Sequence, residues 1–165
     1  ISGPALLSAS IALMLGLSVF ALTDRLFDRN AAYMSLAMLW GTATILLVAL
    51  TPRVDVTLSF FLLLAHHALL TALYSNSETR HHYFYLSAVF LGLSFGIKYG
   101  GLLYTACLSP LVVFVAFKNS HDLLNASKKI LIFFFIIFVL MSPWLIKNWI
   151  LFEAPLYPFF SSSSR

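Results

Sequence analysis

The sequence predicts an all-α protein, a polytopic transmembrane helical bundle with about six spans. Three observations support this: 61% of the 165 residues are hydrophobic, only 10% are charged, and the mean hydropathy is +0.93. A soluble domain has about 25% charged residues, and a membrane-crossing helix needs roughly 20 apolar residues. With a single cysteine and no alternation of polar positions, the composition also excludes a disulfide-stapled module and a porin-like barrel.

Six apolar runs account for the predicted spans. They cover 5–22, 31–50, 56–73, 83–97, 102–117 and 130–146. The fourth and fifth are short for complete crossings, but one long helix over 83–117 would place Lys98 at mid-depth, which is energetically expensive. We therefore predict two helices that meet at Gly100-Gly101.

The Lys and Arg residues predict the orientation. Loops 23–30, 75–82 and 118–129 share one face and hold six of them, against three or four on the other face. Because cytoplasmic loops carry an excess of Lys and Arg, segments 51–55, 98–101 and everything after Lys147 are predicted to lie outside. The net charge of +4 then reflects topology, and no basic stripe predicts a nucleic-acid partner.

No internal repeat or boundary divides the chain, so residues 1–165 are interpreted as a single transmembrane domain. The chain begins without methionine, enters an apolar helix within five residues, and ends in four serines and Arg165. We therefore expect an internal piece of a larger protein, inactive by itself.

Asp55 is a charged residue at the outer end of the third predicted span, and two interpretations account for it. In a structural interpretation it stabilises the positive end of the helix dipole, with Thr51 as the cap and Pro52 in the first turn. In a functional interpretation it faces a water-filled cavity and orients a substrate, or holds a basic partner such as Arg53.

Lys98 follows a glycine-rich stretch, GLSFGI, at 92–97. Gly92 and Gly96 would form a small-xxx-small face for helix packing, and the glycine pair after Tyr99 would permit a tight turn. A lone lysine near a helix end usually snorkels to the interface. At an outer junction rich in glycine it could instead bind a phosphate as a point charge.

A third segment, SPWLIKNW at 142–149, lies where the last span leaves the bilayer, and EAPLYPFF follows at 153–160. Pro143 should kink the helix, and the tryptophans fit an interfacial aromatic belt. Lys147-Asn148 places a cation beside an amide. The belt does not explain the prolines around Tyr157, which predict an ordered, extended segment.

His66-His67 lies within the third predicted span. Adjacent helical residues point about 100° apart, so the two rings do not face one ligand. We expect a packed, hydrogen-bonded histidine rather than a metal or haem site. No Walker loop, HExxH, CxxC or nucleophile elbow is present, so no metal and no cofactor is predicted.

Together these segments resemble membrane-embedded glycosyltransferases of the GT-C fold, the group that contains protein O-mannosyltransferases and lipid A aminoarabinose transferases. The similarity covers about 51–160 and rests on the order of several short motifs. Glu153-Ala154 departs from the glycine–asparagine of bacterial relatives. The matching elements are Pro52-Arg53-Val54-Asp55, Gly92, Gly96, Lys98-Tyr99-Gly100-Gly101, Pro143-Trp144, Lys147-Asn148 and Pro155-Leu156-Tyr157-Pro158.

The resemblance implies transfer of a sugar from a polyprenyl-phosphate carrier to an acceptor on the extracytoplasmic face of a bacterial inner membrane, in the cell envelope. The lipid-linked sugar is then the donor substrate, and membrane lipid is the other partner. Asp55 matches a supporting acidic position, whereas the family's base lies in an earlier outer loop absent from this sequence. The implied substrate-binding residues are Lys98, Tyr99, Lys147, Asn148 and Tyr157.

The alternative is a non-enzymatic membrane transporter or assembly subunit, in which Asp55 and Lys98 form a structural or gating pair. The enzyme hypothesis requires these two residues to meet at one outer rim, where a cation can stabilise the charge on a departing phosphate. Placement in opposite leaflets, or toward hydrocarbon, would leave only the bundle. Duplicated six-span halves would favour a transporter.

Overall fold

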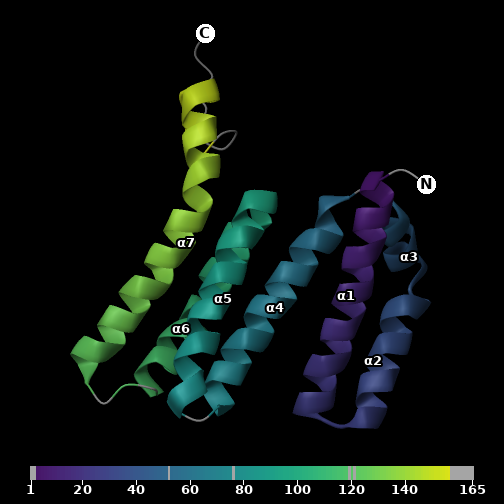
Figure 1. Cartoon of the computed structure of the whole chain (residues 1–165), viewed down its shortest axis with the longest axis horizontal. Helices are drawn as coiled ribbons and strands as arrows, with labels where there is room; N and C mark the ends of the chain where they lie inside the picture. Colours follow the sequence, from purple (N-terminus) through teal and green to yellow (C-terminus); the bar gives the residue numbers. More distant parts are fainter. Residues whose placement is uncertain (1–2, 52, 76, 119, 121, 157–165) are drawn as a thin grey trace.

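The computed structural model describes residues 3–51, 53–75, 77–118, 120 and 122–156, which form seven α-helices and no strand. The helices run back and forth between two ends of the molecule (Figure 1). The predicted all-α bundle is therefore confirmed. The helices are α1 (Gly3–Leu26), α2 (Arg29–Gly41), α3 (Ala43–Leu50), α4 (Val54–Tyr74), α5 (Ser77–Ile97), α6 (Gly100–Lys118) and α7 (Leu123–Phe152).

Among the described residues, four helices are long and apolar enough to cross a membrane, namely α1, α4, α6 and α7. The 21-residue α5 is more polar because its first turns contain Arg80, His81 and His82. Large apolar side chains face outward, with Leu131 72% and Ile150 75% exposed. An extensive apolar exterior marks a surface that lipid covers, so the chain is an integral membrane protein.

The second predicted span, 31–50, is wrong as a single helix. It is divided into α2 and α3 at Thr42, whose backbone is extended. The Thr42 hydroxyl donates to the Met38 carbonyl at 2.8 Å, which competes with the helical ladder, and Gly41 is a weak helix former. At about 1.5 Å per residue neither helix spans a membrane alone. Together they still pass from one end of the bundle to the other (Figure 1).

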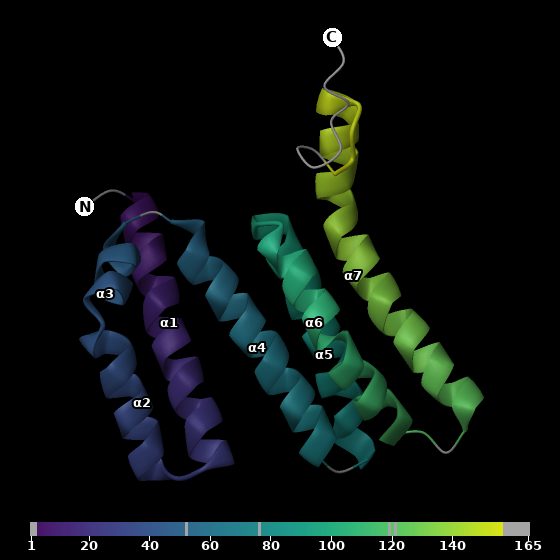
Figure 2. The same ribbon diagram turned by 180° about the vertical axis from the view of Figure 1, so that it is seen from behind.

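The helix ends fall into the two groups that alternating crossings require. Both views place the α1–α2, α4–α5 and α6–α7 connections at one end, and the α3–α4 and α5–α6 connections at the other (Figures 1 and 2). We call the first the basic end, because it carries six cations, and the second the site end. Which end faces the cytoplasm stays a prediction. The cations of the basic end are Arg25, Arg29, Arg80, Lys118, Lys128 and Lys129.

The core is centred on α4 and α5, whose facing surfaces are rich in small residues. Ala65 and Ala72 on α4 and Ala88 on α5 are fully buried, and small residues let helix backbones approach closely. From α7, the Phe133 ring packs 4.9 Å from the Phe84 ring of α5. The opposite side of α4 packs against α1. The N-terminus of α4 therefore lies between the two halves of the bundle, α1–α3 and α5–α7.

Gly92 marks the close crossing of α5 and α7. A Cβ atom there would lie 2.8 Å from Leu140 Cβ and 3.3 Å from Ile137 Cα. A Cβ atom at Gly96 would meet open space. The predicted small-xxx-small face is therefore correct at Gly92 and wrong at Gly96, because the two helices diverge along the next turn.

The last span is longer than the predicted 130–146, because α7 has 30 residues and continues through Lys147 to Phe152. At about 1.5 Å per residue it measures about 45 Å, against roughly 30 Å for the hydrocarbon core of a bilayer. Pro143 lies inside this helix, and the ribbon changes direction along its length in both views (Figures 1 and 2). The final turns of α7 extend past the other helices at the site end.

Candidate functional site at the site end

Asp55 and Lys98 meet at the site end of the bundle. The Lys98 ammonium (Nζ) donates a hydrogen bond to the Asp55 carboxylate (Oδ1) at 2.7 Å, and both side chains are about half exposed. This is the short distance typical of a charge-assisted hydrogen bond. The requirement that the two residues share one rim is therefore met. The partner of Asp55 is Lys98, not Arg53.

Asp55 lies in the first turn of α4, as predicted, but the cap of that helix differs from the prediction. Thr51 ends α3, and its hydroxyl donates to the Leu47 carbonyl at 3.1 Å. The N-cap of α4 is Arg53, which makes no side-chain capping bond. The Asp55 carboxylate is thus the acidic group at the positive end of this helix dipole.

Lys98 is held by the tight turn between α5 and α6. The Gly101 N–H donates to the Lys98 carbonyl at 3.0 Å. A Cβ atom at Gly101 would lie 2.8 Å from the Ser94 carbonyl carbon and 2.9 Å from the Phe95 nitrogen. The predicted tight turn is therefore present, and because no described glycine has a positive φ, Gly101 is needed there for the close approach of the two backbones. Two helices therefore meet here as expected, and the turn fixes the position of Lys98.

Tyr99 extends the site toward α7. Its ring lies 4.8 Å from the Trp144 ring in an edge-to-face arrangement, and Phe95 contacts the same tryptophan at 5.6 Å. Asn148 is buried, and its Nδ2 atom lies 3.5 Å from both the Tyr99 hydroxyl and the Pro155 carbonyl. These aromatic contacts, which favour edge-to-face geometry, bring Asn148 of α7 to Tyr99, the residue that follows Lys98.

An apolar cavity of about 360 Å³ begins at Asp55 and runs along α4. Asp55 is the one charged group among its described lining residues, and Ser59 follows one turn deeper. The volume is in the range of small-ligand sites. The rest of the lining is apolar and comes from four helices: Leu15, Val19, Leu39, Ile45, Val48, Val56 and Leu63.

The other predicted residues are not all gathered here. Lys147 is exposed and makes no ion pair with a described residue, and Tyr157 lies outside the described residues. The predicted packed histidine is His66, whose Nδ1 atom lies 3.3 Å from the Tyr104 hydroxyl. No group of three or more metal-ligating side chains occurs among the described residues.

The sequence did not reveal Phe95 or the lining of the cavity. Phe95 precedes Tyr99 by four residues, a spacing that brings two rings onto one helical face, and this was the available signal. The cavity residues are aliphatic and come from four separate helices, so no local pattern distinguishes them from residues that face lipid.

Residues 3–147 match the sequence model of the family described as dolichyl-phosphate-mannose-protein mannosyltransferase, a stretch that includes Asp55, Lys98 and Tyr99. No curated protein and no solved structure gives a significant match. The match confirms the predicted membrane glycosyltransferase family. Because it covers most of the chain, this integral membrane protein belongs to the dolichyl-phosphate-mannose-protein mannosyltransferase family.

Proposed function

We propose that the chain forms part of a glycosyltransferase that moves a sugar from a polyprenyl-phosphate carrier to an acceptor on the extracytoplasmic face of a bacterial inner membrane. The observation that carries this proposal is the 2.7 Å contact between Lys98 and Asp55, together with the apolar cavity that Asp55 also lines. The family description supports mannose as the sugar and a lipid-linked donor.

The proposed reaction exchanges one bond at the anomeric carbon of the sugar. The acceptor oxygen bonds to that carbon, and the bond between the carbon and the carrier phosphate breaks. A carboxylate base takes the acceptor proton. The electron pair of the broken bond stays on the phosphate oxygen, so polyprenyl phosphate leaves with one additional negative charge, which a nearby cation stabilises.

Lys98 is suited to bind that phosphate. A lysine ammonium has three N–H donors, and the contact with Asp55 uses one of them. The Lys98 side chain is about half exposed, so a ligand can approach the remaining donors. Asp55 acts as a positioning residue, because its carboxylate holds the ammonium beside the first turn of α4 instead of letting it move freely in water.

The apolar cavity is suited to the first isoprene units of the carrier. A polyprenyl phosphate keeps its tail in an apolar environment and its phosphate at the interface. The cavity offers the same order, because Asp55, which holds Lys98, lines one part of it and aliphatic side chains such as Leu63 lie deeper along α4. This polarity along one axis favours a lipid phosphate over a wholly polar substrate.

The tail site is tested by filling the cavity in the full-length protein. We expect Ser59→Trp to weaken binding of a short polyprenyl phosphate by about tenfold, or about 1.4 kcal/mol, because the indole ring would occupy the space proposed for the tail. Titration of the purified protein in nanodiscs measures the affinity. Ser10→Trp is the matched control, since Ser10 is exposed on α1 and is not among the lining residues. Equal affinities for the two variants would refute the tail site.

A further inference from the structure

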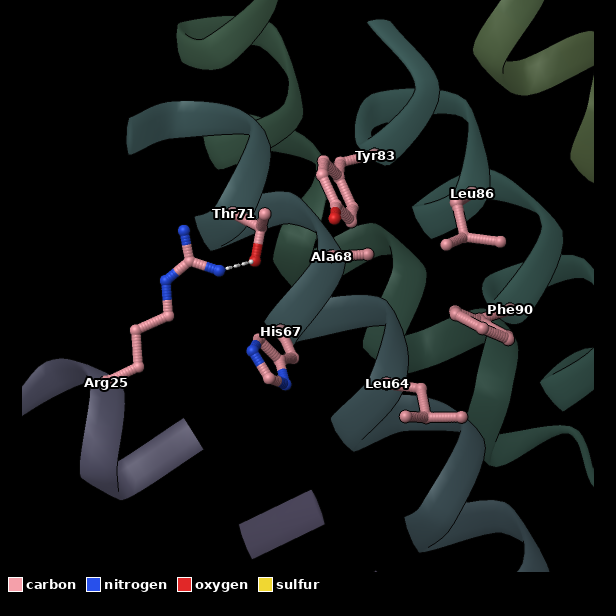
Figure 3. A pocket seen from close by; sticks show the side chains of 8 residues that line it. All are labelled: Arg25, Leu64, His67, Ala68, Thr71, Tyr83, Leu86 and Phe90. Carbon is pink, nitrogen blue, oxygen red and sulfur yellow. Dashed lines mark hydrogen bonds between the residues drawn. The ribbon is translucent and has the colours of Figure 1, made fainter. Parts of the chain in front are cut away.

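A groove separate from the Asp55–Lys98 site crosses α4 toward the basic end. Its volume is about 310 Å³. Its floor is one face of α4, on which lining residues recur at intervals of three or four, and its walls are α1 and α5 (Figure 3). The lining residues are Arg25 of α1, Leu64, His67, Ala68 and Thr71 of α4, and Tyr83, Leu86 and Phe90 of α5.

The groove is polar at one end and apolar at the other. Arg25 is the penultimate residue of α1, Thr71 lies in the last turn of α4, and Tyr83 lies in the second turn of α5. These polar groups are therefore nearest the membrane interface. Leu64 and Phe90 lie about two turns deeper, or roughly 10 Å. A membrane lipid has the same order, with its phosphate at the interface and its chains toward the bilayer centre.

Arg25 is directed into the groove. Its Nη1 atom donates to the Thr71 hydroxyl at 2.6 Å, which draws the guanidinium from α1 across to α4 (Figure 3). A guanidinium has five N–H donors in a fixed fork that fits phosphate oxygens. Among the described side chains Arg25 makes no ion pair, so most of these donors remain for a ligand. The Tyr83 hydroxyl points toward α4 on the opposite wall (Figure 3).

We infer that this groove binds one anionic phospholipid, with its phosphate at Arg25 and the start of one acyl chain along Leu64 and Phe90. The volume holds roughly ten water-sized groups, which accommodates a phosphate and the first carbons of a chain. The six cations of the basic end also favour an anionic headgroup, because basic residues at the end of a bundle attract anionic lipids. The lipid would bridge α1 to α4 and α5 and so join the two halves of the bundle.

Native mass spectrometry of the full-length protein tests this site, with phosphatidylglycerol and phosphatidylcholine as probes. We expect wild type to prefer phosphatidylglycerol, and Arg25→Gln to lose about fivefold in affinity for it, the ratio expected when one basic contact is removed. Lys128→Gln is the matched control: it removes the same charge at the same end, but Lys128 is not a lining residue. Equal losses in the two variants would mean general attraction to basic residues and would overturn the site.

Two further measurements separate the remaining outcomes. Tyr83→Phe removes one hydroxyl and leaves the ring, so it keeps the test valid if Arg25→Gln fails to fold. For Tyr83→Phe we expect a loss of phosphatidylglycerol affinity that is measurable but smaller than that of Arg25→Gln. Unchanged affinity in every one of these variants that folds would refute the proposal. Inorganic phosphate should not displace the lipid, because the apolar end contributes nothing to a free ion. Full displacement by phosphate would make this an anion site and exclude a lipid site.

Discussion

Lys98→Ala should lower sugar transfer by about 100- to 1000-fold in the full-length protein, while membrane insertion stays normal. That range is the usual cost of removing one group that stabilises charge in a transition state. Asp55→Asn should lower transfer too, because the ammonium would lose the carboxylate that holds it at 2.7 Å. The measurement is incorporation of radiolabelled mannose from polyprenyl-phosphate mannose into membrane acceptors, with Lys128→Ala as the matched lysine control.

Exchanging the two charges distinguishes the enzyme from a structural pair. In the double variant Asp55→Lys with Lys98→Asp, the two opposite charges can still meet. If the pair only joins α4 to the α5–α6 turn, the exchange should restore whatever the single variants lose. If Lys98 binds the carrier phosphate, the exchange should restore thermal stability but not transfer, since the cation then lies on α4. Full recovery of transfer, or single variants with unchanged turnover, would refute the proposed role.

Gly101→Ala should be the most disruptive small substitution in the α5–α6 hairpin. The new methyl group would lie 2.8–2.9 Å from backbone atoms of Ser94 and Phe95, which cannot rotate away as a side chain can. Overpacking of this kind costs about 1–3 kcal/mol. We therefore expect a lower melting temperature in detergent and, because the turn positions Lys98, reduced transfer as well.

Gly100→Ala is the matched control for this substitution. Its added methyl group would lie 3.5 Å from Leu58 Cδ2, an ordinary van der Waals contact, so its melting temperature should remain close to that of wild type. Helix propensity alone favours alanine over glycine at both positions. Equal or increased stability in both variants would therefore show that α5 and α6 do not approach as closely as the structure places them.

The helical bundle, and the placement of Asp55 and Lys98 at the same end of it, could be predicted from the sequence. Both depend on the free-energy cost of placing charged groups inside a membrane. The cost of placing Lys98 at mid-depth predicted the break between α5 and α6, and alternating crossings then brought Lys98 to the end of the bundle where α4 begins. The two residues are 43 positions apart, so their direct contact depends on how α4 and α5 pack side by side. Arg53 was a reasonable partner for Asp55 on sequence proximity alone.

Other features depend on local hydrogen bonds or on helix packing, neither of which the hydropathy pattern reveals. The break at Thr42 lies within an apolar run without charges, so hydropathy does not reveal it. Gly92 and Gly96 have the same spacing signal, but only Gly92 faces Leu140. The long helix α7 extends beyond its apolar run because Asn125, Lys128 and Lys129, which hydropathy assigns to a loop, continue the helix at its start. The break at Thr42 follows a local hydrogen bond, and the difference between the two glycines follows the position of the neighbouring helix.

The length of α7 makes the thickness of the surrounding membrane relevant to the protein. The first turns of the helix are polar, with Asn125, Lys128 and Lys129, but the mostly apolar part at 130–152 measures about 35 Å, about 5 Å more than an average hydrocarbon core. Trp149, Ile150 and Leu151 near its tip are exposed. An apolar helix longer than the local core is accommodated by tilting or by thickening of the bilayer around it. Because Trp144 and Asn148 connect this helix to the α5–α6 turn, lipids of different chain length should change the geometry around Tyr99 through hydrophobic mismatch.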